Sequence, residues 1–377
     1  MEFNLSDRQK EFKRIAKKFS NEVLKDKVKF FDENQQVPTE IIKQLYDHGF
    51  GAITIEEEYN GLGCGMLDFA VVIEEISKVC GSTALTLIGS SLGAIAIDLY
   101  GNESQKKKYL PDIADGKKLA TFAVSESSAG SDISSMKTIV EECDDKYIMN
   151  GSKCWITNAE IADIYVVLSK GKGDKYSTFI VEKEFEGFKF GKKEDKLGMR
   201  SSSTGELIFQ NCIIPKENLL YKSGEGMHMA GKILNYSRPI IGAQALGIAE
   251  GAFEDSIRYA KERKQFGKSI SSFQIIKHIL VDMYTEIEAA RWLVYNACKK
   301  IDDNDEDIQV EASISKVFAS NTAMKVTTNA IQILGGYGYI KEYPMEKRMR
   351  DAKVTQIYEG TNQILNNLAA KSLLNRY

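Results

Sequence analysis

One carboxylate near the C-terminus stands in a setting suited to proton abstraction. Glu359 follows two large side chains, Ile357 and Tyr358, and precedes Gly360, which has no side chain. Partial desolvation raises the pKa of a carboxylate toward the working pH, and a glycine gap admits a substrate. Alone, however, the stretch favours a structural interpretation, in which one helix stops and Thr361 caps the next. Glu359 is therefore a candidate general base that needs support from the rest of the chain.

A second set of candidates lies near the middle of the chain. Residues 124–132 leave an expected strand, and their small side chains and N–H donors suit an oxygen-rich ligand such as a flavin edge or a phosphate. The segment is equally compatible with a serine-rich turn. Residues 153–158 alternate as a strand, which places Trp155 and Thr157 on one face as a flat wall and a hydroxyl donor for an aromatic ring system. A strand Trp is more commonly packed in a core.

Two further stretches could contact phosphate groups. Arg263 ends an expected helix in a basic turn and could bind a pyrophosphate bidentately, although basic residues at a helix C-terminus usually complement the helix dipole. Residues 335–338 hold three glycines, whose bare backbone allows phosphate or adenine to approach closely. A C-cap glycine explains one of the three more easily than all of them. None of these stretches is decisive alone.

The hydrophobic periodicity divides the 377 residues into three domains that must position these candidates. Residues 1–115 show helical spacing and predict an all-helical domain. Residues 116–222 predict short strands separated by turn signals such as Asn150-Gly151, which is typical of an antiparallel β-barrel or sandwich. Residues 223–377 return to a helical period. Long helices are expected there at about 224–262, 271–302, 307–334 and 362–375.

Composition and charge exclude several classes of protein. The net charge is -3 with both signs mixed along the chain, which offers no basic surface to nucleic acid and little attraction to an anionic membrane. No apolar run approaches the length of a membrane span, and the first six residues do not resemble an export signal, so we expect a cytoplasmic protein. Six scattered cysteines and three histidines lack metal-ligand spacing, so we expect no metal site and reduced thiols.

Taken together and in this order, the motifs resemble the acyl-CoA dehydrogenase family over essentially the whole chain. The matching motifs are Ser125-Glu126 through Gly130-Ser131-Asp132, Trp155-Ile156-Thr157-Asn158, Lys196-Leu197-Gly198-Met199-Arg200, Glu262-Arg263 with Gln265-Phe266-Gly267, Gln332-Ile333-Leu334-Gly335-Gly336-Tyr337-Gly338, Met349-Arg350-Asp351-Ala352-Lys353 and Ile357-Tyr358-Glu359-Gly360-Thr361. The resemblance implies an α+β fold with an N-terminal all-α domain, a central antiparallel β-barrel or sandwich and a C-terminal four-helix bundle. It also implies a homotetramer built as a dimer of dimers.

The resemblance further implies that FAD is bound between the central domain and the C-terminal helices. The residues expected to contact FAD are Val124, Ser125, Gly130, Ser131, Trp155, Thr157, Arg263, Gln265, Phe266, Gln274, Gln332, Gly335, Gly336, Thr361 and Gln363. Those from Arg263 to Gly336 are expected to hold the FAD of a neighbouring subunit, and Thr157 is expected near N5. The residues expected to contact the acyl-CoA are Ser131, Asn235, Tyr236, Ser237, Arg238 and Gly360.

The reaction implied by the resemblance is the α,β-dehydrogenation of an acyl-CoA thioester to a trans-2-enoyl-CoA. Glu359 would take the α-proton while the β-hydrogen leaves as hydride to flavin N5, and the electrons would pass to an electron-transfer flavoprotein. The thioester carbonyl would be held by a flavin ribityl hydroxyl and by the backbone N–H of Glu359. One branch of the family carries its base just before the arginine of the 235–238 stretch. Here that position is Ser237, which favours the straight-chain, short-to-medium branch.

Several alternatives stay open at this point. Asn235 stands where the family often has aspartate, and residues 235–239 are bulkier than the glycine-rich stretch of many butyryl-CoA enzymes, so an acyl-carrier-protein thioester is an alternative substrate. The same site could act as an enoyl-CoA reductase, or as an oxidase where oxygen has access. A non-catalytic flavin- or CoA-binding assembly subunit is disfavoured by the intact Glu359. Chain length is open, because the buried helix expected at 83–99 would set the depth of the pocket.

Overall fold

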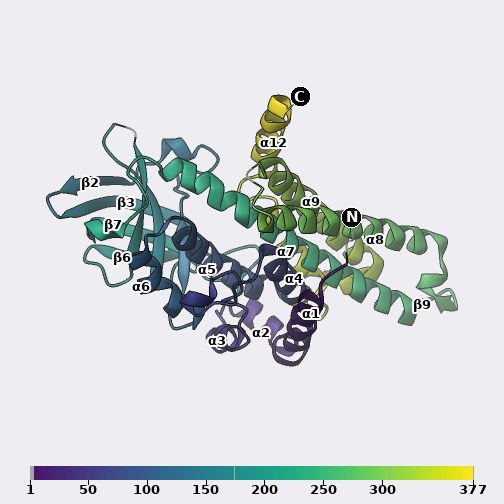
Figure 1. Cartoon of the computed structure of the whole chain (residues 1–377). Helices are drawn as coiled ribbons and strands as arrows, with labels where there is room; N and C mark the ends of the chain where they lie inside the picture. The colour runs from purple at the N-terminus through teal and green to yellow at the C-terminus, as the bar shows by residue number, and fades with distance from the viewer. Residues whose placement is uncertain (1–3, 174, 306, 377) are drawn as a thin grey trace.

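The computed structural model describes residues 4–173, 175–305 and 307–376. Helices occupy the chain up to Ala114, strands follow, and long helices complete it (Figure 1). Residues 1–3, which belong to the segment expected to lack an export signal, lie outside the described residues. The first helical part contains α1 (Asp7–Phe19), η1 (Ser20–Leu24), η2 (Lys25–Lys27), α2 (Val28–Glu33), α3 (Thr39–Asp47), η3 (Glu57–Tyr59), α4 (Met66–Ser77), α5 (Gly81–Tyr100) and α6 (Glu103–Ala114).

The central part is one mostly antiparallel sheet in the order β6-β7-β3-β2-β4-β5-β8, and β1 pairs with β4 in parallel. Its elements are β1 (Ala120–Ala123), η4 (Ile133–Ser135), β2 (Ile139–Cys143), β3 (Lys146–Thr157), β4 (Ile164–Lys170), β5 (Tyr176–Glu182), β6 (Phe188–Lys193), β7 (Thr204–Pro215), η5 (Lys216–Asn218) and β8 (Leu219–Leu220). The turn expected at Asn150-Gly151 is wrong, because β3 runs through both residues. A β-bulge between Met149 and Gly151 absorbs the irregularity instead.

The C-terminal part is built on long helices that pack side by side (Figure 1). Its elements are α7 (Gly226–Glu262), β9 (Lys264–Gln265), β10 (Lys268–Ser269), η6 (Ile270–Ser272), α8 (Gln274–Asp302), α9 (Gln309–Leu334), α10 (Gly336–Tyr339), α11 (Met345–Thr355) and α12 (Asn362–Arg376). Helix α7 continues through Pro239, and its middle is buried against α9. Helix α11 was not expected from the sequence. It places residues 356–361 in the turn between α11 and α12.

Helix α5 joins the first part of the chain to the other two. It is 20 residues long and apolar enough to cross a membrane by length and composition, contrary to expectation, yet 89% of its most apolar window is buried inside the protein. Gly89 lets β3 approach closely, since a Cβ there would lie 2.7 Å from the Thr157 Cγ2. At the first residue of α5, the Gly81 carbonyl accepts a 2.8 Å hydrogen bond from Gln244 of α7. One helix therefore contacts both the sheet and the C-terminal helices.

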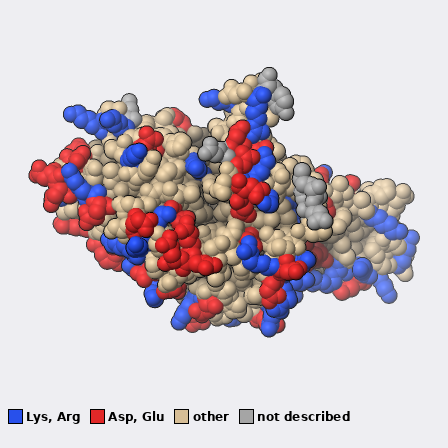
Figure 2. All heavy atoms as spheres, in the orientation of Figure 1, with Lys and Arg blue, Asp and Glu red and all other residues tan. Residues whose placement is uncertain are grey.

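Two of the motifs noted in the sequence dock onto each other. The Met199 N–H donates to the Asp351 carboxylate at 2.6 Å, and Arg350 donates to the Leu197 carbonyl at 2.9 Å. Lys347 pairs with Asp351 from the preceding turn of α11. These contacts attach the loop between β6 and β7 to α11, the helix that leads directly into the Glu359 turn. On the face shown in Figure 2, acidic and basic side chains are interspersed.

Candidate functional site

Glu359 lies in a tight turn between α11 and α12. Its φ is 55° and that of Gly360 is 96°, so both residues adopt left-handed backbone. The Glu359 side chain turns back toward α7, where its Oε2 accepts a 2.8 Å hydrogen bond from the Ser237 hydroxyl. Thr361 receives a 3.4 Å bond from the Ile364 N–H and so caps α12. The helix-capping interpretation and the candidate base therefore apply to the same turn.

Arg238, next to Ser237 on α7, stabilises this turn by a hydrogen bond to its backbone. Its Nε donates to the Glu359 carbonyl at 3.3 Å, and its Nη1 donates to Asn235 at 2.5 Å. The side chain is buried, and burial lowers the pKa of Arg238 to about 10 despite the opposing effect of Glu359. The guanidinium is positively charged at neutral pH and lies within the group formed by Glu359, Ser237 and Asn235. Most of the residues expected to contact substrate are thus brought together with the base.

Lys316 of α9 completes the charged environment of Glu359. Its ammonium donates to the Gly360 carbonyl at 2.8 Å and to the Asn362 Oδ1 at 3.1 Å, and the residue is fully buried. Burial lowers the pKa of Lys316 to about 7, with the nearby Glu359 charge opposing that shift. Burial likewise raises the pKa of Glu359, and Ser237, Arg238 and Lys316 partly offset the increase. The carboxylate is consequently more basic than an ordinary glutamate.

Tyr358 and Ile357 do not form the apolar wall that the sequence suggested. Ile357 is 52% exposed, so it cannot desolvate the neighbouring carboxylate. Tyr358 points inward, and its hydroxyl donates to the side-chain carbonyl of Gln244, which in turn donates to the Gly81 carbonyl of α5. The contacts to Glu359 and Gly360 come instead from Ser237 and Arg238 of α7 and Lys316 of α9. Gln244, Lys316 and Asn362 were missed from the sequence, where the only signal was polar residues within otherwise apolar helical faces.

Trp155 and Thr157 lie near the end of β3, beside the serine-rich segment. A register shift between Lys153 and Ile156 interrupts the strand alternation, and Trp155 has a φ of 58°, so the expectation of a shared face from period two does not apply. Trp155 is 56% exposed, contrary to the core packing usual for tryptophan. The Cys154 N–H donates to the Ser125 carbonyl at 3.0 Å, which fixes the serine-rich segment against β3. An exposed indole next to backbone and hydroxyl donors suits a planar ring.

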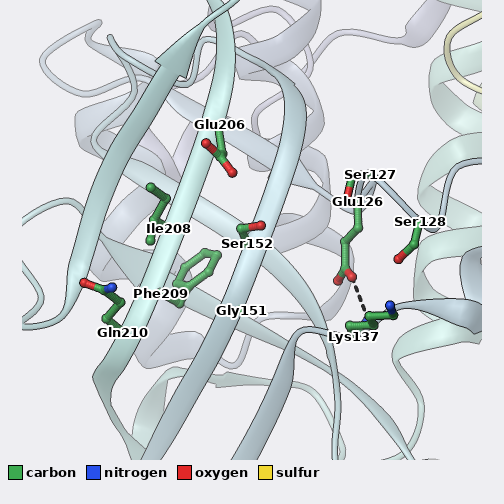
Figure 3. A pocket seen from close by; sticks show the side chains of 10 residues that line it. All are labelled: Glu126, Ser127, Ser128, Lys137, Gly151, Ser152, Glu206, Ile208, Phe209 and Gln210. Carbon is green, nitrogen blue, oxygen red and sulfur yellow. Dashed lines mark hydrogen bonds between the residues drawn. The ribbon is translucent and has the colours of Figure 1, made fainter.

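A buried ion pair anchors the start of this segment. Lys153 donates to Glu126 at 2.7 Å and to the Val124 carbonyl at 2.9 Å. The Glu126 carboxylate also accepts from the N–H groups of Lys137 and Thr138, at 2.6 and 3.1 Å. Figure 3 shows Glu126 beside Lys137 at the edge of an open cavity of about 490 Å³ that β3 and β7 also line. The pair thus ties residues 124–126 to β3 and to the segment before β2.

A second cavity, of about 430 Å³, lies at the end of α9. Four of the expected cofactor residues line it together, namely Arg263, Gln265, Gly335 and Gly336. Arg263 lies over the Tyr337 ring, 5.4 Å from its centroid. The remaining expected residues of this group, Phe266, Gln274 and Gln332, are exposed and do not line the cavity. Phe266 is 92% exposed between β9 and β10, and β9 lies at the tip between α7 and α8 (Figure 1).

Models of acyl-CoA dehydrogenase domains match this chain in three consecutive segments. The N-terminal domain matches residues 6–117, the middle domain residues 121–212 and the C-terminal domain residues 224–374. A short-chain-specific acyl-CoA dehydrogenase from Clostridium acetobutylicum is 43% identical over 369 residues, which cover 97% of each chain. The similarity therefore spans nearly the full length of both proteins.

Solved structures agree with these matches. Butyryl-CoA dehydrogenase from Megasphaera elsdenii superposes with a TM-score of 0.97 at 42% identity, covering 99% of this chain and 100% of that one. A chain in a structure described as the electron transferring flavoprotein of Acidaminococcus fermentans gives 0.97 at 45% identity, covering 99% and 100%. An acyl-CoA dehydrogenase of Bacillus anthracis complexed with FAD gives 0.92 at 32%, covering 99% and 68%. The expected arrangement of helical, β and helical parts is confirmed, and the chain belongs to the acyl-CoA dehydrogenase family.

Proposed function

We propose that this protein dehydrogenates a short-chain acyl-CoA at Cα and Cβ, with Glu359 as the base that removes the α-proton. The protein is an oxidoreductase acting on a CH–CH group, as its family membership establishes. The observation that carries the proposed mechanism is the Glu359 carboxylate, whose pKa burial raises and whose position Ser237 fixes at 2.8 Å. A short acyl chain is supported by the short-chain-specific relative and by the similarity to butyryl-CoA dehydrogenase.

FAD is the cofactor, and the residues present suit it. Trp155 offers an exposed indole face, and a Cβ added at Gly335 or Gly336 would meet no atom within 4 Å, which leaves room for a ligand to approach the backbone. Arg263 adds a guanidinium that can bind a pyrophosphate bidentately. When bound, FAD supplies the acceptor for the hydride that leaves the β-carbon. We assign Trp155, Thr157 and the expected contacts in residues 124–131 to the ring side.

We assign the remaining expected contacts as follows. The residues proposed to contact the phosphate and adenosine parts of FAD are Arg263, Gln265, Phe266, Gln274, Gln332, Gly335, Gly336, Thr361 and Gln363. The exposed position of Phe266 and Gln274 at the outer end of α7 and α8 supports a role toward a neighbouring subunit, and hence a homotetramer. The acyl-CoA contacts are Ser131, Asn235, Tyr236, Ser237, Arg238 and Gly360.

The turn around Glu359 supplies two groups to the reaction. The carboxylate removes the α-proton, and the backbone N–H of Glu359 donates to the thioester carbonyl, where negative charge develops. That N–H has no hydrogen-bond acceptor within residues 4–173, 175–305 and 307–376, which leaves it available for substrate. Ser237 and Arg238 hold the carboxylate and the carbonyl of the same residue, so proton abstraction and carbonyl polarisation are positioned by one turn.

We further propose that the electrons pass to an electron-transfer flavoprotein in the cytoplasm. The similarity to a chain in the Acidaminococcus fermentans structure supports that partner. All six cysteines are unpaired thiols, which agrees with a reducing compartment.

An anaerobic absorbance titration tests the proposed function directly. The purified protein is mixed with acyl-CoAs of about four to twelve carbons and a branched one, and bleaching of bound FAD is followed, since the proposed reaction reduces it. Bleaching is expected first with the four-carbon thioester. A flavin that stays oxidised with every CoA ester but bleaches with carrier-protein thioesters would overturn the CoA assignment. Absence of bleaching with both classes would overturn the dehydrogenase assignment.

Replacing Arg263 with alanine is expected to weaken FAD binding about 10- to 100-fold, because a charge-assisted bidentate contact is lost. FAD content per subunit and the dissociation constant for added FAD measure this. Arg258→Ala is the matched control, because Arg258 is a half-exposed arginine in the last turns of α7, close before Arg263, that pairs with Asp255 and does not line the Arg263 cavity. Equal FAD affinity in the two variants would contradict the assignment.

Replacing Gly360 with alanine is expected to reduce both stability and kcat/KM. The φ of 96° costs a non-glycine residue roughly 1–2 kcal/mol, and the added Cβ would lie 2.9 Å from the Leu365 Cδ2. Either the Leu365 side chain or the turn must shift, and a shift of the turn displaces Glu359. Thermal unfolding and butyryl-CoA kinetics measure the two effects. Gly231→Ala is the control, because Gly231 is an exposed α7 residue with open space at its Cβ position, and it should lose neither property.

A further inference from the structure

Lys316 is a buried cation whose partners are neutral. Its ammonium has two acceptors, the Gly360 carbonyl and the Asn362 amide oxygen, and both belong to the turn that carries Glu359. Among the residues that the structure describes, no carboxylate forms an ion pair with it. Burying an ammonium without an ion-pair partner is costly, so a buried lysine of this kind needs a reason beyond local stability.

Asn362 is held on its other side by α9 itself. Its Nδ2 donates to the Ser320 hydroxyl at 2.9 Å and to the Asn321 side chain at 3.0 Å. Lys316 and Ser320 are four residues apart and therefore lie on the same face of α9. This face of α9 therefore forms hydrogen bonds with both the Gly360 carbonyl and Asn362, the first residue of α12. The left-handed backbone of Glu359 and Gly360 is thus fixed from α9 as well as from Arg238 on α7.

Two charged groups act on Lys316. One is the Glu359 carboxylate in the turn, and the other is the Arg238 guanidinium on α7. The same carboxylate is influenced by Ser237, Arg238 and Lys316, all of which lower its pKa against the effect of burial. The two cations therefore favour the ionised form of Glu359, which is the form that can accept a proton.

We propose that Lys316 is a positioning residue for Glu359, fixing the left-handed turn through Gly360 and Asn362 and keeping the carboxylate ionised with its positive charge. The inference rests on the proposed function of Glu359 as the base. Because burial places the pKa of Lys316 at about 7, its charge is fully present below neutral pH and fades above it. Lys316 therefore favours the ionised form of Glu359 most strongly at pH values below its own pKa of about 7.

Replacing Lys316 with methionine tests the inference through the pH profile of kcat/KM. The charge is lost while most of the side-chain volume is kept, so the pKa of Glu359 should rise and the acid limb should move up by about one pH unit. Activity should therefore fall about 10-fold on that limb and recover as the pH is raised. A merely structural role would reduce activity by the same factor at every pH. Lys325→Met is the matched control on α9, because Lys325 is exposed and pairs with Glu286; it should leave the limb unchanged.

A second pair of variants covers the case in which Lys316→Met fails to fold, as judged by its flavin spectrum and thermal unfolding. Asn362→Asp gives the Lys316 ammonium a carboxylate partner that offsets its positive charge beside Glu359, so it should raise the acid limb. Asn321→Ala removes only a contact of the Asn362 Nδ2 and should leave the limb in place. An unmoved limb in a folded Lys316→Met, or in Asn362→Asp, would overturn the inference. Failure of the proposed function is distinguishable, since it would appear as no bleaching of the unsubstituted protein or as full activity of Glu359→Gln.

Discussion

Replacing Glu359 with glutamine is expected to lower the rate of substrate-dependent flavin reduction by about 10³-fold while FAD stays bound. Glutamine keeps the size of the side chain and can still accept the 2.8 Å hydrogen bond from Ser237, so the turn should be preserved. It cannot accept the α-proton, and loss of a general base typically costs 10² to 10⁴ in rate, roughly. Anaerobic stopped-flow absorbance with butyryl-CoA measures the rate, and the flavin spectrum before mixing reports cofactor content.

Glu342→Gln is the matched control for this experiment. Glu342 is an exposed glutamate between α10 and α11, outside the Glu359 turn, and its replacement should leave the reduction rate unchanged. A Glu359→Gln protein that reduces its flavin at the unsubstituted rate would show that another group removes the proton. Loss of FAD from Glu359→Gln would mean that the carboxylate also supports cofactor binding, contrary to the geometry, in which it contacts Ser237.

Breaking the buried Lys153–Glu126 pair is expected to lower the free energy of unfolding by about 3 kcal/mol. Lys153→Met removes the ammonium and leaves the Glu126 carboxylate, which is 4% exposed, with only the N–H groups of Lys137 and Thr138. An uncompensated buried charge is the main cause of the loss. Urea unfolding at pH 7 measures it. Lys137→Met is the control, since the Lys137 side chain is exposed and only its backbone contacts Glu126.

The double variant Lys153→Met with Glu126→Gln should be less destabilised than the two single variants summed, because neither charge is then left alone. The pH dependence has a defined sign. Burial raises the pKa of Glu126, but the hydrogen bonds from Lys153 and the Lys137 N–H outweigh it, so the folded pKa is lowered. This stabilisation is present above the unfolded value of about 4.3 and is lost as the pH falls through the folded value. Additive single-variant effects would contradict a coupled pair.

The sequence predicted the long helices well because their apolar spacing is governed by burial on one face. Helices α7, α8, α9 and α12 all begin and end within a few residues of the expected positions. The strands of the sheet were harder to predict. Asn150-Gly151 is typical of a turn, but β3 continues through both residues with a β-bulge. Helix α11 was not predicted because most of its residues are polar or basic, and its few buried positions do not form an apolar pattern. Local patterns identify elements but do not reveal which irregularities a neighbouring strand tolerates.

The candidate base was found from its short motif, but its supporting residues were not. Glu359 is held by residues that lie 121 and 122 positions earlier in the chain. Lys316 is 44 positions from Gly360, and Gln244 is 114 from Tyr358. Lys316 and Gln244 are polar residues within otherwise apolar helical faces, but their spacing along the helices does not show which distant segment they contact. Only the packing of α7 against α9 assigns them to the turn.

The support of the Glu359 turn has a consequence for how the chain acquires its activity during folding. Within the described part of the chain, the side chains that contact Glu359 and Gly360 through hydrogen bonds come from α7 and α9, whereas the local sequence provides backbone bonds to Val354 and Gln356 and the Thr361 cap. Contacts of such sequence separation form late, after the loops between them have closed. A collapsed intermediate that already holds its helices would therefore bury much of its core and still lack an ordered base.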